Sequence, residues 1–163
     1  MSDLESVVAA LGDALRAHAL KLATAESCTG GLVAAACTAV AGSSDWFERG
    51  FVTYSNEAKT EMLGVSASLI GAHGAVSAEV ARAMAEGALA RSPATLAVSV
   101  TGIAGPGGAV PGKPVGTVWV AFAERGSPAR AELLRLSGDR TSIREQTVRH
   151  VLARLVEEAV SRG

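Results

Sequence analysis

The chain has 163 residues, of which 48% are hydrophobic and 19% charged, and its formal net charge is −1. A chain of this length and composition can bury a sizeable core, so we expect one folded domain over residues 1–163 and no disordered tract. The near-zero charge lacks the basic excess that is typical of nucleic-acid-binding proteins, so we expect no nucleic-acid partner.

Membrane and metal partners are also unexpected. No apolar run is long enough to span a bilayer, and the polar first residues do not resemble a signal peptide. The two cysteines, Cys28 and Cys37, fit neither a zinc pattern nor a disulfide framework. We therefore expect a cytoplasmic protein without a metal or another cofactor.

Helical and strand patterns alternate along the first part of the chain. Apolar residues at helical spacing predict an amphipathic opening helix, with Ser2 and Glu5 as its capping box. Residues 20–25 alternate weakly and predict a short strand. Residues 32–40 are apolar on every side, which predicts a helix in the centre of the fold.

A second strand is predicted over residues 47–54, followed by a short helix with Asn56 as its N-cap. Ser77 is expected to begin another helix that runs to about Arg91. Three further strands are predicted over residues 95–101, 116–123 and 130–136.

The chain is predicted to end in a hairpin and a helix. Residues 124–128 are few enough to join the last two strands as an antiparallel hairpin. Apolar residues at helical spacing predict the final helix, with Ser142 and Glu145 as its capping box. Helices between strands, together with a late hairpin, favour an α/β fold: a three-layer α/β/α sandwich around a mixed sheet. The strand order does not follow from these patterns.

Four polar or glycine-rich stretches interrupt the apolar chain: residues 26–31, 54–59, 74–77 and 101–108. We expect them at strand ends, where open α/β sheets bind their ligands. One glycine-rich loop is weak evidence for a site, but four in a small domain indicate a shared cleft.

Ser27 lies in a tight strand-to-helix connection, where it is a candidate nucleophile. The backbone N–H groups around Thr29, Gly30 and Gly31, at the positive end of the following helix, are suited to an oxyanion or a phosphate. The alternative is that Ser27 or Thr29 merely caps this helix.

Lys59 is the candidate base. With Asn56 as N-cap, Lys59 would be the third residue of its helix, where the helix dipole disfavours a cation and favours the neutral amine. A neutral lysine can accept a proton from a serine; the alternative is a solvated surface lysine. Tyr54, the only tyrosine, is suited to relay a proton or to bond the nucleophile, unless it is simply a half-buried strand residue.

Other nucleophile and base arrangements compete with this pair. Of the three histidines, His18 and His150 are expected at the surface, whereas His73 lies in a predicted loop and stays a candidate for a triad. Cys28 is a possible thiol nucleophile, although a small packed residue is the simpler interpretation.

The remaining candidates bind substrate. Thr101 ends a convincing strand, and its hydroxyl is suited to bond a substrate or the lysine. Asn56 belongs to the same polar stretch as Lys59. Gly105 and its neighbours offer backbone N–H groups to an anion, or form only a flexible turn. Arg140 is suited to hold a phosphate with its planar fork, or makes a surface salt bridge.

Five motifs together resemble the CinA C-terminal domain family, a family that includes stand-alone nicotinamide-nucleotide amidases. They are Thr-Ala-Glu-Ser-Cys-Thr-Gly-Gly (24–31), Val-Thr-Tyr-Ser-Asn-Glu-Ala-Lys (52–59), Gly-Ala-Val-Ser (74–77), Thr-Gly-Ile-Ala-Gly-Pro (101–106) and Lys-Pro-Val-Gly-Thr-Val (113–118). They occur in the family's order and cover nearly the whole chain.

This resemblance implies hydrolysis of nicotinamide mononucleotide to nicotinate mononucleotide and ammonia, in pyridine-nucleotide recycling. It also implies a homo-oligomer, and a nucleophilic Ser27 that acts with Lys59 and Tyr54. Thr101 and Arg140 match positions that the family links to its substrate site. The larger N-terminal domain of full CinA proteins has no counterpart in this sequence, so its activity is not expected. Two alternatives stay open: a nucleotide-binding or regulatory module with little or no catalysis, and an amidase for another carboxamide.

Overall fold

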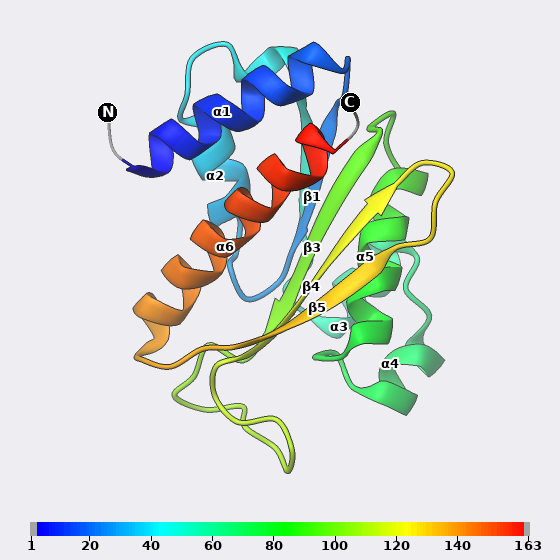
Figure 1. The fold of residues 1–163 in the computed structure, drawn as a ribbon. Helices are drawn as coiled ribbons and strands as arrows, with labels where there is room; N and C mark the ends of the chain where they lie inside the picture. The colour runs from blue at the N-terminus through cyan, green and yellow to red at the C-terminus, as the bar shows by residue number, and fades with distance from the viewer. Residues whose placement is uncertain (1–2, 162–163) are drawn as a thin grey trace.

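The computed structural model describes residues 3–161, which form three layers around a five-stranded mixed sheet (Figure 1). The strand order is β2-β1-β3-β4-β5. The first three strands in the chain are parallel, and the last two pair antiparallel as the predicted hairpin. The strands are β1 (Leu22–Glu26), β2 (Phe47–Val52), β3 (Leu96–Gly102), β4 (Thr117–Glu124) and β5 (Arg130–Arg135).

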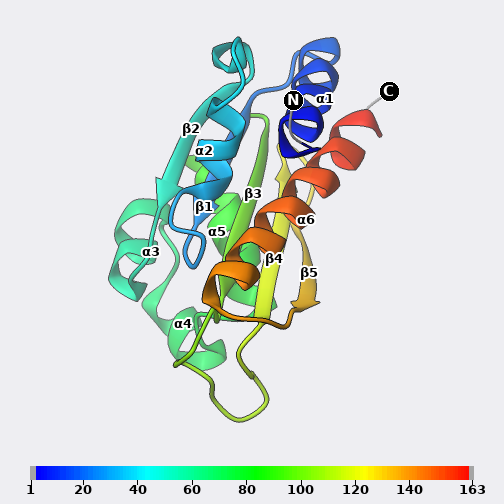
Figure 2. The ribbon, with the colours of Figure 1, turned by 90° about the vertical axis from the view of Figure 1, so that its left-hand side faces the viewer.

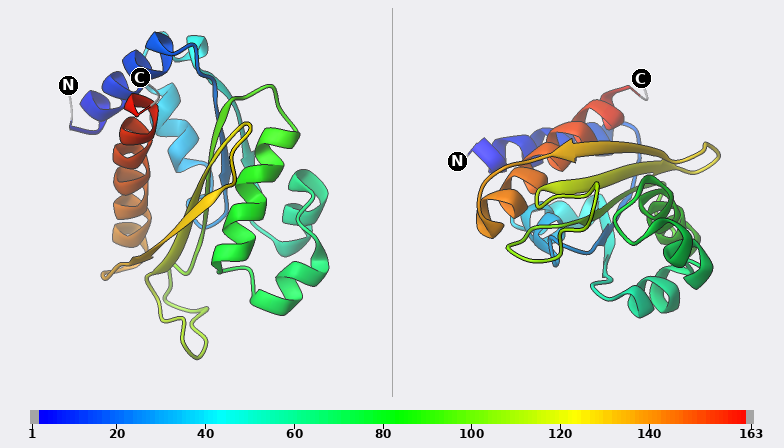
Figure 3. Two further views of the ribbon diagram at one scale, coloured as in Figure 1. Left: turned by 45° about the vertical axis from the view of Figure 1, so that its right-hand side comes forward. Right: turned by 90° about the horizontal axis from the view of Figure 1, so that it is seen from below.

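Helices cover both faces of the sheet, which confirms the predicted α/β/α sandwich (Figures 2 and 3). One face carries α1 (Asp3–Ala17), α2 (Leu32–Thr38) and α6 (Arg140–Val160), with the short 3-10 helix η1 (Ser43–Asp45) near its margin. The opposite face carries α3 (Asn56–Leu63), α4 (Ala67–His73) and α5 (Ala78–Ala90).

The central strand β3 shows why the two faces differ. Val98 and Val100 belong to the apolar cluster under α1 and α6, whereas Ala97 belongs to the cluster under α5. Ser99, on the same face as Ala97, donates a hydrogen bond from its hydroxyl to the Ala81 carbonyl of α5 at 2.6 Å. Successive strand residues point to opposite faces, so the small residues of one face let the alanine-rich α5 approach the sheet closely.

The helix boundaries confirm one predicted cap and correct another. Ser77 caps α5, because its side chain accepts a hydrogen bond from the Val80 N–H. The predicted capping box of the final helix is wrong: the N-cap lies three residues earlier, at Asp139, which accepts from the Ser142 N–H at 2.8 Å. Ser2, predicted to cap the first helix, lies outside the described residues.

The depth of α2 and the presence of α4 also differ from expectation. Only Val33 and Cys37 of α2 are buried, and Leu32 is 37% exposed, so α2 is a surface helix and not the centre of the fold. Its alanine side chains have little apolar area, so their exposure to water costs little free energy. Helix α4, capped by Ser66, occupies a segment that the sequence analysis left without an element.

Candidate active site

The topology brings three strand ends together at one edge of the sheet. From β1 the chain crosses one face through α2 to reach β2, and then crosses the other face through α3, α4 and α5 to reach β3. The chain leaving β1 turns toward β2, on one side, and the chain leaving β3 turns toward β4, on the other side. Between the ends of β1 and β3 this divergence opens a crevice, which is where α/β sheets bind ligands. Ser27 directly follows β1, and its N–H donates to the Val100 carbonyl of β3 at 3.0 Å.

A pocket of about 300 Å³ lies in this crevice. All four polar stretches contribute to its wall, as the sequence predicted. Loop 103–116, between β3 and β4, projects from the same edge of the sheet (Figure 1) and supplies the outer wall. Seven of the predicted site residues line the pocket: Ser27, Tyr54, Asn56, Lys59, Thr101, Gly105 and Arg140. No carboxylate lines it among the described residues, whereas the guanidinium of Arg140 does, so the pocket suits an anionic ligand.

At the inner end of the pocket, Lys59 and Ser27 are in contact. The Lys59 Nζ lies 3.2 Å from the Ser27 Oγ, and the two residues are 1% and 8% exposed. Lys59 also donates to the carbonyl oxygens of Thr53 at 3.2 Å and Tyr54 at 3.4 Å. No ion pair to Lys59 is present in residues 3–161.

Burial lowers the pKa of Lys59, because the charged amine loses hydration that no carboxylate replaces. The Ser27 hydroxyl itself donates to the Tyr54 carbonyl at 3.4 Å, and its oxygen accepts from the Lys59 amine. In the neutral form, two N–H donors of the amine reach the two carbonyls, and its lone pair receives the serine proton once the hydroxyl rotates from the Tyr54 carbonyl toward the amine. This geometry is suited to take a proton from the serine.

The position of Lys59 in its helix differs from the prediction. Ser55, not Asn56, caps α3 by accepting from the Ala58 N–H at 3.0 Å. Lys59 is therefore the fourth helical residue and not the third. The largest cause of its lowered pKa is burial and not the helix dipole.

Tyr54 contributes its backbone carbonyl to the inner end and its ring to the outer rim. The carbonyl accepts from the Ser27 hydroxyl at 3.4 Å, as well as from Lys59. The side chain is exposed, and its hydroxyl accepts from the Arg140 Nη2 at 3.1 Å. In the described part of the chain, no hydrogen bond joins this hydroxyl to Ser27 or Lys59, so the geometry contains no proton relay through the ring.

The outer wall is held by backbone contacts. Arg140 donates from its Nη1 to the Gly105 carbonyl at 2.8 Å. Gly105 has a φ of +83°, and a Cβ there would lie 2.6 Å from the Val115 Cγ1, so only glycine fits. Thr101 donates to the Ala75 carbonyl at 2.9 Å, which ties β3 to the loop before α5 and leaves the oxygen lone pairs of the hydroxyl on the pocket side.

The turn after Ser27 is built differently from the expectation. Thr29, Gly30 and Gly31 do not line the pocket. The amino end of α2 is occupied by Glu26, whose carboxylate accepts from the Val33 and Ala34 N–H groups at 2.8 and 3.0 Å. Neither Ser27 nor Thr29 caps α2. Glu26, buried at the end of an apolar strand, was the overlooked signal, since a buried carboxylate needs such donors.

The competing nucleophile and base have unsuitable surroundings. Cys28 is 6% exposed, and burial raises the pKa of its thiol to about 11, so it is protonated at neutral pH. His73 ends α4 instead of lying in a loop; it does not line the pocket, and its Nδ1 lies 3.8 Å from a Glu79 oxygen.

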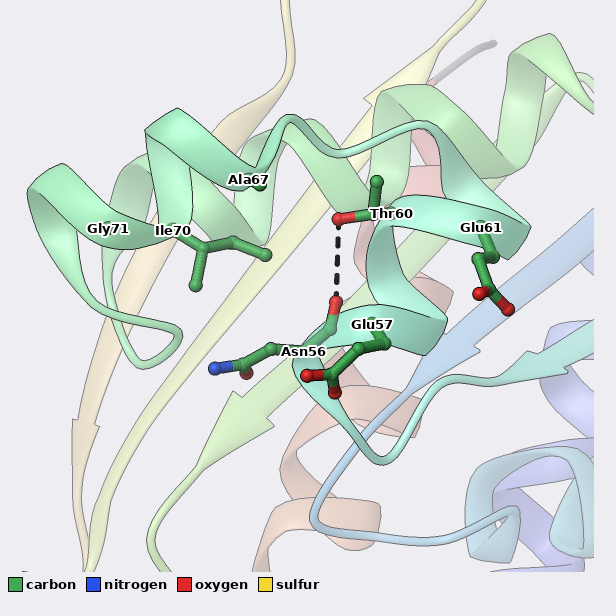
Figure 4. Close-up of a pocket in the computed structure, with 7 residues that line it drawn as sticks. All are labelled: Asn56, Glu57, Thr60, Glu61, Ala67, Ile70 and Gly71. Carbon is green, nitrogen blue, oxygen red and sulfur yellow. Dashed lines mark hydrogen bonds between the residues drawn. The ribbon is translucent and has the colours of Figure 1, made fainter.

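A second pocket, of about 400 Å³, lies between α3 and α4 (Figure 4). Its polar lining includes Asn56, which also reaches the first pocket, and the carboxylates of Glu57 and Glu61. The Thr60 hydroxyl there points to the Asn56 carbonyl of its own helix (Figure 4). Among the described residues, the Thr60 hydroxyl makes no hydrogen bond to Glu57 or Glu61, whereas Ser27 and Lys59 of the first pocket are in contact.

Residues 3–161 contain no group of three His, Cys, Asp or Glu side chains placed to hold a metal ion. None of the helices that they form has both the length and the apolar character to cross a membrane.

The mixed sheet, the buried contact of a serine with a lysine and the arginine-lined pocket at the parallel strand ends define the class of the protein: a single-domain α/β protein with a polar ligand site. Within this class, the chain belongs to the CinA C-terminal domain family, whose model matches residues 4–159.

The relatives include both short and long proteins. The chain is 49% identical over 157 residues to the nicotinamide-nucleotide amidohydrolase PncC of Escherichia coli (strain K12), covering 96% of this chain and 95% of that protein. It is 56% identical over 138 residues to a CinA-like protein of Akkermansia muciniphila, covering 85% of this chain and 33% of that protein. The chain spans only 32% to 38% of the length of three such longer relatives.

A solved structure has the same fold over almost the whole chain. The competence/damage inducible protein CihA of Agrobacterium tumefaciens superposes with a TM-score of 0.92 at 46% identity, and the match covers 96% of each chain.

Proposed function

We propose that the protein is an amidohydrolase that converts nicotinamide mononucleotide to nicotinate mononucleotide and ammonia through a serine–lysine acyl-enzyme mechanism. The observation that carries the proposal is the buried Lys59 Nζ, which has no carboxylate partner among residues 3–161 and lies 3.2 Å from the Ser27 Oγ. The similarity to PncC amidohydrolases over nearly their full length supports the choice of substrate.

In the first step, Ser27 attacks the carboxamide carbon while the neutral Lys59 takes its hydroxyl proton. The lysine becomes an ammonium ion whose three N–H groups face the Thr53 and Tyr54 carbonyls and the substrate. The carbonyl oxygen of the amide becomes an oxyanion. Such charge is stabilised by backbone N–H groups aimed at it. The Cys28 N–H, which directly follows the nucleophile, makes no hydrogen bond to another residue within residues 3–161 and serves this role.

In the second step, Lys59 returns the proton to the departing nitrogen, and the C–N bond breaks to release ammonia. The remaining ester joins the nicotinoyl carbon to the Ser27 oxygen. Water then attacks this carbon with Lys59 again acting as base, which releases nicotinate mononucleotide and restores the serine.

The phosphate is bound at the outer rim, where Arg140 supplies the cation. An arginine keeps its charge in all conditions that the enzyme meets, and its planar fork matches phosphate oxygens. The glycine-rich backbone of residues 104–108 and the Thr101 and Asn56 side chains also line the pocket, where they would contact the rest of the nucleotide. Binding energy from the phosphate would align the amide with Ser27, so we expect a preference for the nucleotide over free nicotinamide.

We further propose that the enzyme works as a homo-oligomer in the cytoplasm, in pyridine-nucleotide recycling. The cytoplasmic setting is supported by Cys28 and Cys37, both of which are buried and unpaired. Family membership supports the proposals of an oligomer and of this pathway.

The proposed function is tested by a coupled assay of ammonia release from nicotinamide mononucleotide, nicotinamide riboside and free nicotinamide. We expect turnover of the mononucleotide first, with loss of at least about a thousandfold in Ser27→Ala, since acyl transfer cannot begin without the hydroxyl. The exposed Ser137→Ala is the matched control.

Two results contradict the proposal. Near wild-type ammonia release by Ser27→Ala excludes the acyl-enzyme mechanism. A rise in melting temperature with the nucleotide, but without ammonia release by the wild type, would indicate a binding module instead of an enzyme.

A further inference from the structure

Arg144 contacts the turn that carries Ser27 from a distant part of the chain. It lies on α6, four residues after Arg140, and is separated from the turn by more than a hundred residues of sequence. Its Nε donates to the Cys28 carbonyl at 3.1 Å, and its Nη2 donates to the Thr29 carbonyl at 3.3 Å. One edge of the guanidinium thus holds two successive carbonyls directly after the nucleophile.

The turn depends on such a support because its backbone is intrinsically soft. Gly30 and Gly31 are both in the left-handed region, with φ of +59° and +105°. Other contacts also restrain the turn: the Ser27 N–H donates to β3, the Gly30 N–H donates to the Ser27 carbonyl at 3.0 Å, and the Thr29 hydroxyl donates to Glu26 at 2.6 Å. Because glycine lacks a Cβ, the two glycines leave the backbone more freedom than other residues would, and the contacts of Arg144 reduce that freedom.

The fit between the arginine and the turn is close. A Cβ on Gly30 would lie 3.3 Å from the Arg144 Nη2, so the guanidinium lies directly against the backbone of this residue. The Nε and Nη2 donors lie side by side in one plane and reach two neighbouring oxygens together, which a lysine amine cannot do with the same geometry.

Arg140 and Arg144 lie on one face of α6 and contact different walls of the pocket. Residues four apart on a helix project from the same side. Arg140 lines the pocket and holds Gly105 and Tyr54 of the outer wall. Arg144 does not line the pocket and holds the opposite wall through Cys28 and Thr29. The beginning of α6 therefore connects both walls.

We propose that Arg144 is a positioning residue, which orients the Ser27 hydroxyl and the Cys28 N–H by fixing the peptide groups that follow the nucleophile. The kinetic test of this role rests on the proposed function, because it uses nicotinamide mononucleotide as the substrate. Because Arg144 does not touch the substrate pocket, its loss slows the chemical step and leaves substrate affinity nearly unchanged.

The test compares Arg144→Lys and Arg144→Met with Arg149→Met, a control on the same helix whose exposed arginine makes no hydrogen bond or ion pair with the described residues. Displacing a reacting group by about 1 Å can lower a rate about a hundredfold. We expect kcat for nicotinamide mononucleotide to fall about tenfold to a hundredfold in Arg144→Lys and Arg144→Met, with KM within about threefold. Arg149→Met should behave as the wild type. Unchanged kcat in both Arg144 variants overturns the proposal.

A second measurement separates positioning from folding and from the choice of substrate. A phosphonofluoridate labels an activated serine when the hydroxyl oxygen bonds to phosphorus and fluoride leaves. Mass spectrometry then gives both the rate and the final extent of Ser27 labelling. We expect Arg144→Lys to reach one label per chain, as the wild type does, but about tenfold more slowly, consistent with a misplaced nucleophile.

The combined outcomes are decisive. A labelled fraction well below one at the wild-type rate shows that Arg144 only supports folding, which overturns the proposal. If the wild type is labelled at Ser27 faster than Arg144→Lys but releases no ammonia from the nucleotide, the positioning role is supported and the proposed substrate is contradicted.

Discussion

At the inner end of the pocket, Lys59 is 1% exposed, whereas at the outer rim the Tyr54 side chain is 61% exposed beside Arg140. The inner end is held by short-range contacts of Lys59 and Ser27 to strand-end carbonyls. The rim is held by long side chains that reach across the pocket.

The two ends use different cations for a physical reason. A lysine loses its proton readily when it is buried, whereas an arginine stays charged. In the proposed mechanism, the dry end therefore provides a neutral base, and the wet rim provides a permanent positive charge for an anion. We expect substitutions at the inner end to change kcat, and substitutions at the rim to change KM.

The largest expected effect follows from removing the inner base. In Lys59→Met, kcat for ammonia release should fall by about a thousandfold, within the range of general base catalysis. Methionine fills a similar volume without the amine, so the melting temperature should stay at or above the wild-type value. A variant that folds and keeps its turnover would contradict the division of roles.

The pH profile tests the same base in the wild type. Catalysis needs the neutral amine, so kcat/KM should rise with pH through the pKa of Lys59 and level off above it. Burial lowers this pKa below the 10.5 of an exposed lysine, which brings the rise closer to neutral pH. The residual activity of Lys59→Met should lack this rise.

A smaller effect is expected at the rim. In Arg140→Met, KM for nicotinamide mononucleotide should rise about tenfold to a hundredfold, because a hydrogen bond to a charged group contributes about 1.5–3 kcal/mol. Steady-state kinetics with nicotinamide riboside, which lacks the phosphate, provide the control. There the wild type and the variant should have similar KM values. An equal penalty with both substrates would mean that Arg140 supports Gly105 and Tyr54 and does not bind phosphate.

The sequence predicts the inner end better than the rim. Ser27 and Lys59 follow two predicted strands, and the structure shows these strands to be parallel, so their ends meet at one edge of the sheet. The predicted N-caps fail where two nearby residues are both suited to cap the same helix. Asp139 and Ser142 are both good caps for α6, as Ser55 and Asn56 are for α3, and only the structure distinguishes them.

Two further features depend on tertiary contacts that local patterns do not contain. Helix α2 is apolar on every side, but alanine tolerates both burial and exposure, so its depth is decided by the packing of α1 and α6. The contact of Arg144 with Cys28 depends on where α6 begins above the sheet, and the sequence shows only two arginines at helical spacing.

The smallest effect is expected next to the nucleophile, at Cys28. Because burial raises the pKa of this thiol to about 11, almost no thiolate is present at pH 7.5. Alkylation by iodoacetamide, followed by mass spectrometry, should be slow at pH 7.5 and accelerate as the pH approaches this pKa. Cys28→Ala should keep kcat within about threefold, because it removes one small buried atom and leaves the backbone N–H in place. Rapid alkylation that stops turnover, together with an inactive Cys28→Ala, would move the nucleophile from oxygen to sulfur. Ser27 and Cys28 would then exchange roles, and the contact of Lys59 with the Ser27 hydroxyl would no longer explain catalysis.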